Sequence, residues 1–259
     1  MSDPRLELSI ADGVARITFA NARRRNAIDL AFVEAFAEAT QTCAVDPSVR
    51  VVVIAAQGEM FSVGGDLADF LAHEDHVEAH IRRIATLFHV AISCLHRAPS
   101  PVVLALNGTA AGGGFSIVLG ADLVVAKRSA RLVSAYTKSG LTPDGGATYF
   151  LERVVGYRKA FEIMALNPVI DAQTALSLGL VSEVVDDDRF DEAVEAIVKR
   201  LLAIPSDALV RLKQQMRLGA SSSLVEQLDR ELDDISAQAA KPSTLDALRG
   251  FLGKPKPAA

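Results

Sequence analysis

Two glycine-rich segments form the first pattern in this sequence that bears on chemistry. One spans residues 61–67 (FSVGGDL), and the other spans residues 107–115 (NGTAAGGGF), with three consecutive glycines. Each follows an apolar, strand-like run and precedes a helix-like one. Glycine permits left-handed backbone angles and close approach of main chains, and free amides at the start of a helix bind anions. Two such amides directed at one oxygen would form an oxyanion hole.

Taken singly, each segment is better explained by a tight turn that serves close packing. Residues 107–115 lack the correctly spaced glycines of a dinucleotide fingerprint, and no Gly-Lys-Ser/Thr follows them as in a phosphate-binding loop. The glycines therefore suggest a site only if the fold brings the two segments together.

The elements that must position these segments alternate between strand and helix, which predicts the α/β class. Apolar runs predict strands at 5–10, 14–19, 50–56, 101–106 and 121–126, with Asp12-Gly13 as a hairpin turn. Helices are predicted at 29–45, capped by Asp29, in a polar stretch near 66–97, and from Gly112 to Gly120. From Phe190 onward the pattern is helical only. We therefore divide the chain into a core, 1–189, and a helical C-terminal region, 190–259.

Composition narrows the class of protein further. Half of the 259 residues are hydrophobic and the net charge is −5, so there is no electrostatic case for nucleic-acid binding. No basic start precedes an apolar stretch, and no apolar run reaches the length of a membrane span. Cys43 and Cys94 fit no metal or redox spacing and are expected to be reduced core residues. These features predict a soluble cytoplasmic protein without a membrane partner.

The ordered motifs of the chain resemble the crotonase, or enoyl-CoA hydratase/isomerase, family over nearly the whole length. They are Arg25-Asn26-Ala27, residues 61–67, residues 101–114, Ala121-Asp122, residues 140–146 (GLTPDGG), residues 178–181 (LGLV) and residues 251–254 (FLGK). The resemblance implies a crotonase-type α/β spiral of ββα units with a C-terminal helical trimerisation region. It also implies a homotrimer or a dimer of trimers.

The resemblance further implies a coenzyme A thioester as the substrate, with no permanently bound cofactor. Gly65 and Gly113 would donate their amides to the thioester oxygen. Phe251 and Lys254 would reach the coenzyme A of a neighbouring subunit, although core packing is an equal alternative for Phe251. Contacts to coenzyme A in the same subunit would come from near Arg25, Ala27, Val63, Asp66 and Leu67.

The hydratases of this family use two glutamates, and both are missing here. The matching positions hold Ser116 and Tyr136, and a serine hydroxyl cannot serve as a carboxylate base near neutral pH. Asp144 remains, in a Pro-Asp-Gly sequence that on its own predicts a turn. Isomerases of the family place an Asp in a similar turn, so the resemblance implies that Asp144 moves a proton from C2 to C4 of a 3-enoyl thioester.

Histidines leave further alternatives open. His89 and Asp144 match by position the general base and the nucleophile of 4-chlorobenzoyl-CoA dehalogenases, which carry Trp where this chain has Tyr136. Because Phe88 and Val90 flank His89, we expect a packed core side chain. A hydrolase triad of Ser116, His89 and Asp144 lacks the Gly-x-Ser-x-Gly turn.

Two short polar stretches remain. Residues 73–80 contain three histidines but no His-Glu-x-x-His motif, so a solvated helix over the site is expected rather than a metal site. In the basic run of residues 23–25, at least one Arg is expected to contact coenzyme A phosphates.

The sequence thus predicts an acyl-CoA enzyme, foremost a Δ3-Δ2-enoyl-CoA isomerase with Asp144 as its acid/base. The alternatives are hydration of an unusual enoyl-CoA, dehalogenase-like hydrolysis, and acyl-CoA binding without catalysis.

Overall fold

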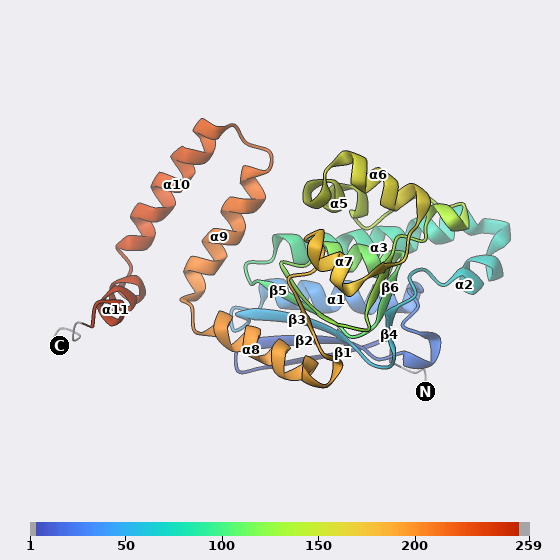
Figure 1. Cartoon of the computed structure of the whole chain (residues 1–259), viewed down its shortest axis with the longest axis horizontal. Helices are drawn as coiled ribbons and strands as arrows, with labels where there is room; N and C mark the ends of the chain where they lie inside the picture. The colour runs from blue at the N-terminus through green and yellow to red at the C-terminus, as the bar shows by residue number, and fades with distance from the viewer. Residues whose placement is uncertain (1–3, 254–259) are drawn as a thin grey trace.

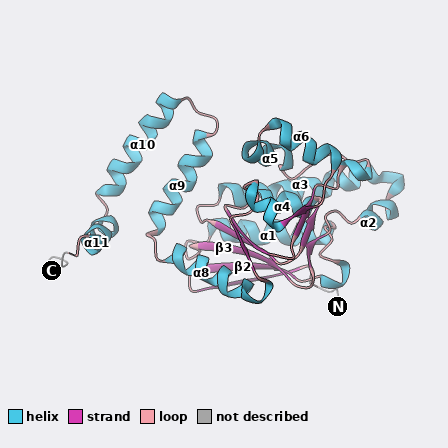
Figure 2. Ribbon diagram, in the orientation of Figure 1, coloured by secondary structure: helices cyan, strands magenta, loops and turns pink. Residues whose placement is uncertain are grey.

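The computed structural model describes residues 4–253, and its larger sheet has six strands in the order β1-β2-β3-β5-β7-β10. β1 (Leu6–Ala11) and β2 (Val14–Phe19) form the predicted antiparallel hairpin. The remaining neighbours are parallel: β3 (Val51–Ala56), β5 (Val102–Leu106), β7 (Leu123–Lys127) and β10 (Glu183–Val185). Strands and helices alternate along the chain, so the α/β prediction is confirmed (Figures 1 and 2).

A smaller sheet lies beside the first and completes a repeating unit. Its strands are β4 (Met60–Ser62), β6 (Thr109–Ala111), β8 (Arg131–Val133) and β9 (Ile170–Asp171). β4, β6 and β8 each follow a strand of the larger sheet and precede a helix, which gives three successive ββα units. The sequence predicted no strand at residues 60–62, because three residues are too few to reveal a strand by alternation.

The helices pack on the larger sheet from both sides. α1 (Leu30–Val45) begins at Asp29, whose carboxylate accepts the Phe32 amide at 2.9 Å, and it lies against α3 (Val77–Arg97). The predicted helix near 66–97 is broken into α2 (Leu67–Ala72), a 3-10 turn (Glu74–His76) and α3. The other core helices are α4 (Gly113–Leu119), α5 (Ala147–Val155), α6 (Tyr157–Leu166) and α7 (Ala172–Ser177), with 3-10 turns at Ala22–Arg24, Thr137–Ser139 and Asp187–Arg189.

Side chains on β3 alternate between two apolar clusters. Val52 and Ile54 join the main core beneath α1 and α3. Val51 and Val53 point to the opposite face, where α8 (Phe190–Leu202) covers the sheet. A strand buried on both faces needs a continuous apolar run, which is what residues 51–56 supply.

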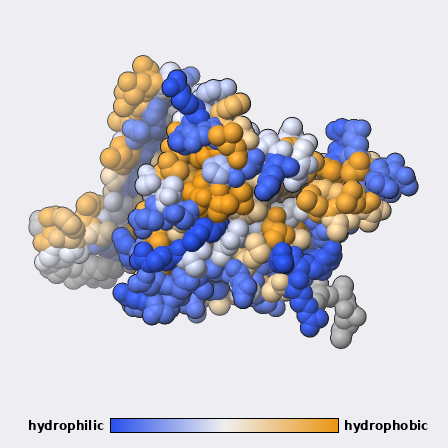
Figure 3. Space-filling model, turned by 45° about the vertical axis from the view of Figure 1, so that its right-hand side comes forward, coloured by the Kyte–Doolittle hydropathy of each residue, from blue (hydrophilic) through white to orange (hydrophobic). Residues whose placement is uncertain are grey.

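Three C-terminal helices form an arm that extends from the core (Figure 1): α9 (Ser206–Gly219), α10 (Leu224–Ala239) and α11 (Pro242–Phe251). Lys213 ties α9 to the core, with its ammonium 2.7 Å from the Asp122 carboxylate. Apolar side chains lie exposed on the arm, as the orange regions on the left of Figure 3 show. No helix of residues 4–253 is long and apolar enough to cross a membrane.

Candidate active site

The two glycine-rich segments meet backbone to backbone. Gly64 has φ of +84°, and a Cβ placed on it would lie 2.7 Å from the carbonyl oxygen of Ala111 and 3.1 Å from the Gly113 nitrogen. A side chain at residue 64 would push the segments apart. Glycine is therefore required here both for the positive φ and for the close approach.

The contact places the amides of Gly65 and Gly113 beside one cavity. Ile28 holds the first segment, because its amide donates to Gly64 O at 2.8 Å and its carbonyl accepts from Asp66 N at 3.0 Å. Within residues 4–253 neither the Gly65 nor the Gly113 amide donates to a protein acceptor. Both amides are thus available to one negatively charged oxygen, which is the arrangement of an oxyanion hole.

The cavity has a volume of about 410 Å³ and mostly apolar walls. α2 contributes Leu67 and Phe70, while α3 contributes Ile81, Ile84 and Phe88. Asp144 supplies the only carboxylate among the described residues that line it. An acyl group that enters this cavity would therefore meet the two amides, an apolar wall and a single carboxylate.

Tyr136 and Ser116 hold Asp144 in place. The Tyr136 hydroxyl donates to Asp144 Oδ1 at 2.7 Å and lies 2.8 Å from Ser116 Oγ, and Ser116 Oγ donates to the Asp144 carbonyl at 2.9 Å. Burial, together with the nearby Asp144 charge, strongly raises the pKa of Tyr136. The phenol consequently stays protonated and remains a donor to the carboxylate.

His89 lies next to Asp144 but not in the core. Its side chain is 54% exposed, so the predicted core packing is wrong. The residues at i±1 lie on other faces of a helix, so the apolar Phe88 and Val90 gave no information about the direction of His89. Its Nε2 accepts from Gly145 N at 3.2 Å and stands 3.6 Å from Asp144 Oδ2. The first contact requires an unprotonated Nε2, whereas an ion pair with Asp144 would require a protonated one.

Comparison with known proteins now decides the family. The model of the enoyl-CoA hydratase/isomerase family matches residues 9–258. The chain belongs to this family. It is an acyl-CoA enzyme of the crotonase type.

Among its relatives is 4-chlorobenzoyl coenzyme A dehalogenase-2 of Arthrobacter sp., 30% identical over 98% of this chain and 92% of its own. Another is 1,2-epoxyphenylacetyl-CoA isomerase of Escherichia coli K12, 28% identical over 96% and 95%. A crystal structure of an enoyl-CoA hydratase/isomerase from Mycobacterium abscessus has a TM-score of 0.92 and 31% identity, with 97% of this chain and 98% of that one covered. These names span different reactions, so family membership does not choose the chemistry.

Two of the residues expected to contact coenzyme A lie at the cavity. Val63 and Leu67 line the cavity, and the Val63 amide donates to Arg25 O at 3.1 Å. Arg25 is exposed, whereas Ala27 is buried. Asp66 is buried and already engaged, because its carboxylate pairs with Arg24 and caps α2 through the Asp69 amide. The Asp66 carboxylate is therefore held by Arg24 and the start of α2 rather than free.

Phe251, one of the two expected C-terminal contacts, does not line the cavity of the same chain. Phe251 ends α11 and is 91% exposed, so it is not a core residue. In Figure 1 the arm and α2 lie at opposite ends of the molecule. Lys254 lies outside the described residues. A role of Phe251 at coenzyme A would thus require a second subunit.

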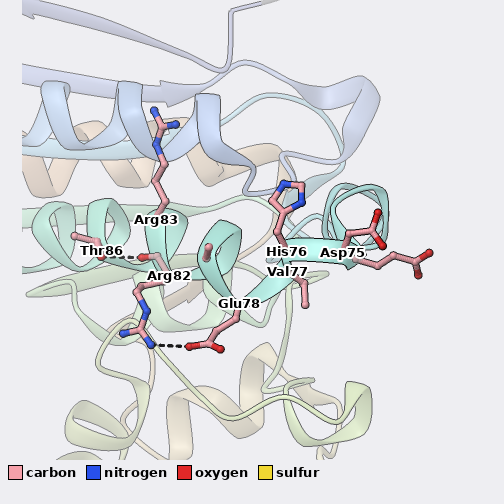
Figure 4. Close-up of a pocket in the computed structure, with 9 residues that line it drawn as sticks. Asp75, His76, Val77, Glu78, Arg82, Arg83 and Thr86 are labelled. Carbon is pink, nitrogen blue, oxygen red and sulfur yellow. Dashed lines mark hydrogen bonds and ion pairs between the residues drawn. The ribbon is translucent and has the colours of Figure 1, made fainter.

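A separate open hollow, shown in Figure 4, is lined by residues between 74 and 86. Most of its lining residues are of polar type, with an exposed Arg82–Glu78 ion pair at 3.0 Å and a hydrogen bond from Thr86 to Arg82 O. Neither glycine-rich segment borders it. The hollow offers neither the apolar walls nor the paired amides that distinguish the cavity around Asp144.

Proposed function

We propose that the protein is a Δ3-Δ2-enoyl-CoA isomerase in which Asp144 carries the proton. The observation that supports this most is the single carboxylate among the described residues of a cavity that also presents the Gly65 and Gly113 amides. An enolate needs both a base at the α-carbon and stabilisation of the developing oxyanion. The cavity holds one group for each task.

In this mechanism the thioester oxygen binds to the amides of Gly65 and Gly113. Asp144 removes a proton from C2, the electrons move onto the oxygen, and the protonated carboxyl returns the proton at C4 as the double bond moves into conjugation. The Tyr136 hydroxyl occupies Oδ1, which leaves Oδ2 to exchange the proton. One base is sufficient because the proton that leaves C2 is the one returned to C4.

Hydration is less well supported, because Ser116 and Tyr136, at the positions of the two hydratase glutamates, already form hydrogen bonds within the protein. The Ser116 hydroxyl is fully buried, bonded to Tyr136 and to the Asp144 carbonyl, and absent from the cavity lining. Tyr136 stays protonated and donates to Asp144. Neither side chain can act as the second carboxylate of a hydratase.

Dehalogenase-like hydrolysis is the second candidate, and the proximity of His89 to Asp144 favours it. Asp144 would attack the chlorine-bearing ring carbon and expel chloride, and water activated by His89 would then hydrolyse the aryl ester. Against this stands the hydrogen bond from Gly145 N, which occupies the Nε2 lone pair needed by a base. We therefore rank isomerisation first.

One experiment separates these reactions. The protein is incubated in turn with a 3-enoyl-CoA, a 2-enoyl-CoA and 4-chlorobenzoyl-CoA, and the products are followed by mass and absorbance. Isomerisation leaves the mass unchanged, hydration adds water, and dehalogenation releases chloride. Our proposal expects turnover of the 3-enoyl-CoA alone at a substantial rate. Acyl-CoA binding without any turnover would contradict it.

The proposal includes assembly into a homotrimer or a dimer of trimers through the arm. Leu224, Leu228, Leu232 and Ile235 follow helical spacing on α10 and are each more than half exposed in the single chain. Exposed apolar stripes of this kind mark interfaces. We also infer a cytoplasmic location, in keeping with Cys43 and Cys94, which are free thiols, the first buried and the second partly buried.

A further inference from the structure

Three side chains with metal-binding groups meet where α2 joins α3. Asp69 lies in α2, His73 ends that helix, and His80 lies in the first turn of α3. One ligand atom from each lies within 4.8 Å of the others. His80 Nε2 stands 2.6 Å from Asp69 Oδ2, and His73 Nδ1 stands 3.5 Å from Asp69 Oδ1. We call Asp69, His73 and His80 the α2–α3 cluster.

These distances suit a small tetrahedral ion. Zinc binds imidazole nitrogen and carboxylate oxygen at about 2.0–2.2 Å, so two ligand atoms of a tetrahedral site lie about 3.3 Å apart. The two observed separations, 2.6 and 3.5 Å, lie on either side of that value. His73 Nδ1 also lies 2.8 Å from the Asp69 carbonyl oxygen, so an ion would replace this hydrogen bond as well as the contact between His80 and Asp69. Small side-chain rotations would then equalise the distances.

The stacking of the two imidazoles supports a site rather than a simple ion pair. The rings of His73 and His80 lie 3.8 Å apart at an interplanar angle of 12°. The stack keeps the two imidazoles side by side with nearly parallel planes, so both rings are held together beside the Asp69 carboxylate. His80 is only 9% exposed, whereas His73 is 36% exposed, so the cluster is preorganised on one side and open on the other.

We propose that the α2–α3 cluster binds a divalent transition-metal ion of the zinc type, with water completing the coordination. Imidazole and carboxylate are ligands that suit this class of ion. The cluster is separate from the cavity lining, so the ion takes no part in the proton transfer. α2 nevertheless supplies Leu67 and Phe70 to the cavity wall. A bound ion would thus hold α2, and with it this part of the cavity wall, against α3.

Titration of the metal-stripped full-length protein with Zn²⁺ in a calorimeter tests this proposal. We expect one ion per chain, and an affinity at least about 100-fold weaker in His80→Gln and in Asp69→Asn, since even outer-shell changes cost 10- to 100-fold. His76→Gln, three residues from His73, and His96→Gln, at the far end of α3, should bind as the wild type does. Amide exchange in α2 should slow with Zn²⁺ in the wild type only.

Circular dichroism checks that each variant is folded, and His73→Gln, at the more exposed ligand, replaces any that is not. The proposal is overturned if the wild type binds no stoichiometric Zn²⁺. It is equally overturned if Asp69→Asn and His73→Gln keep the wild-type affinity, or if His76→Gln loses as much as His80→Gln. None of these results depends on the isomerase assay, so the site and the proposed function can fail separately.

Discussion

Gly64→Ala tests whether the contact between the glycine-rich segments builds the oxyanion hole. The new Cβ would lie 2.7 Å from Ala111 O, where ordinary contacts begin at 3.4 Å, so the segments must separate by about 0.7 Å. Oxyanion donors work at about 2.7–3.1 Å, and one lost donor costs about 2.7–4 kcal/mol. We therefore expect kcat for a 3-enoyl-CoA to fall by roughly 10² to 10³.

Gly58→Ala is the matched control for this variant. Gly58 has φ of +85° and its added Cβ would also approach an atom at 2.7 Å, but that atom is the Ala22 methyl group rather than a backbone carbonyl of the site. Both variants should lose about 1–3 kcal/mol of unfolding free energy in urea. Only Gly64→Ala should lose the rate at which the conjugated product forms. The reasoning is refuted if folded Gly64→Ala keeps nearly full kcat, or if Gly58→Ala loses as much.

Three further predictions concern the base, the pH response and the assembly. Tyr136→Phe removes a hydrogen bond to the charged Asp144, worth about 1.5–3 kcal/mol, so kcat should fall by roughly 10- to 100-fold with little change in KM; unchanged kcat in steady-state assays would rule this out. Burial lowers the pKa of His96 below 6.5 in the folded protein, and the nearby positive charges of Arg217 and Lys213 lower it further. The unfolded state therefore binds the proton more readily, and the stability due to neutral His96 is present above pH 6.5 and lost as the pH falls through the folded pKa. Urea unfolding at about pH 7.5 and about pH 5 should show a smaller loss for His96→Gln than for the wild type, and an equal loss would contradict the assignment. Leu228→Asp, in the middle of the exposed stripe of α10, should convert trimers to monomers in sedimentation, whereas a wild-type chain that sediments as a monomer would exclude the proposed trimer.

The larger sheet could be predicted from the sequence because its strands satisfy strong local rules. The hairpin followed from alternation around Asp12-Gly13, and the run at 51–56 is apolar throughout because both faces of β3 are covered. The smaller sheet could not be predicted in this way. β4, β6 and β8 have three residues each, which is less than two periods of a strand pattern, and only pairing between distant segments makes them strands.

The site was predictable in its chemical types but not in its contacts. The glycine-rich segments and Asp144 stand out by residue type and by resemblance. The hydrogen bond from Tyr136 to Asp144 depends on how the chain turns between residues 136 and 144, which no local periodicity encodes. The α2–α3 cluster was missed for a related reason. Asp69 precedes the histidine-rich stretch, and the break between the helices brings it against His80.

Asp144→Asn is the most direct test of the central claim, because it keeps the shape of the side chain and removes the base. The account predicts that isomerisation of a 3-enoyl-CoA falls by at least about 100-fold, the usual contribution of general acid–base catalysis, while the affinity for acyl-CoA is retained. Full isomerase activity in the folded Asp144→Asn protein would contradict the account.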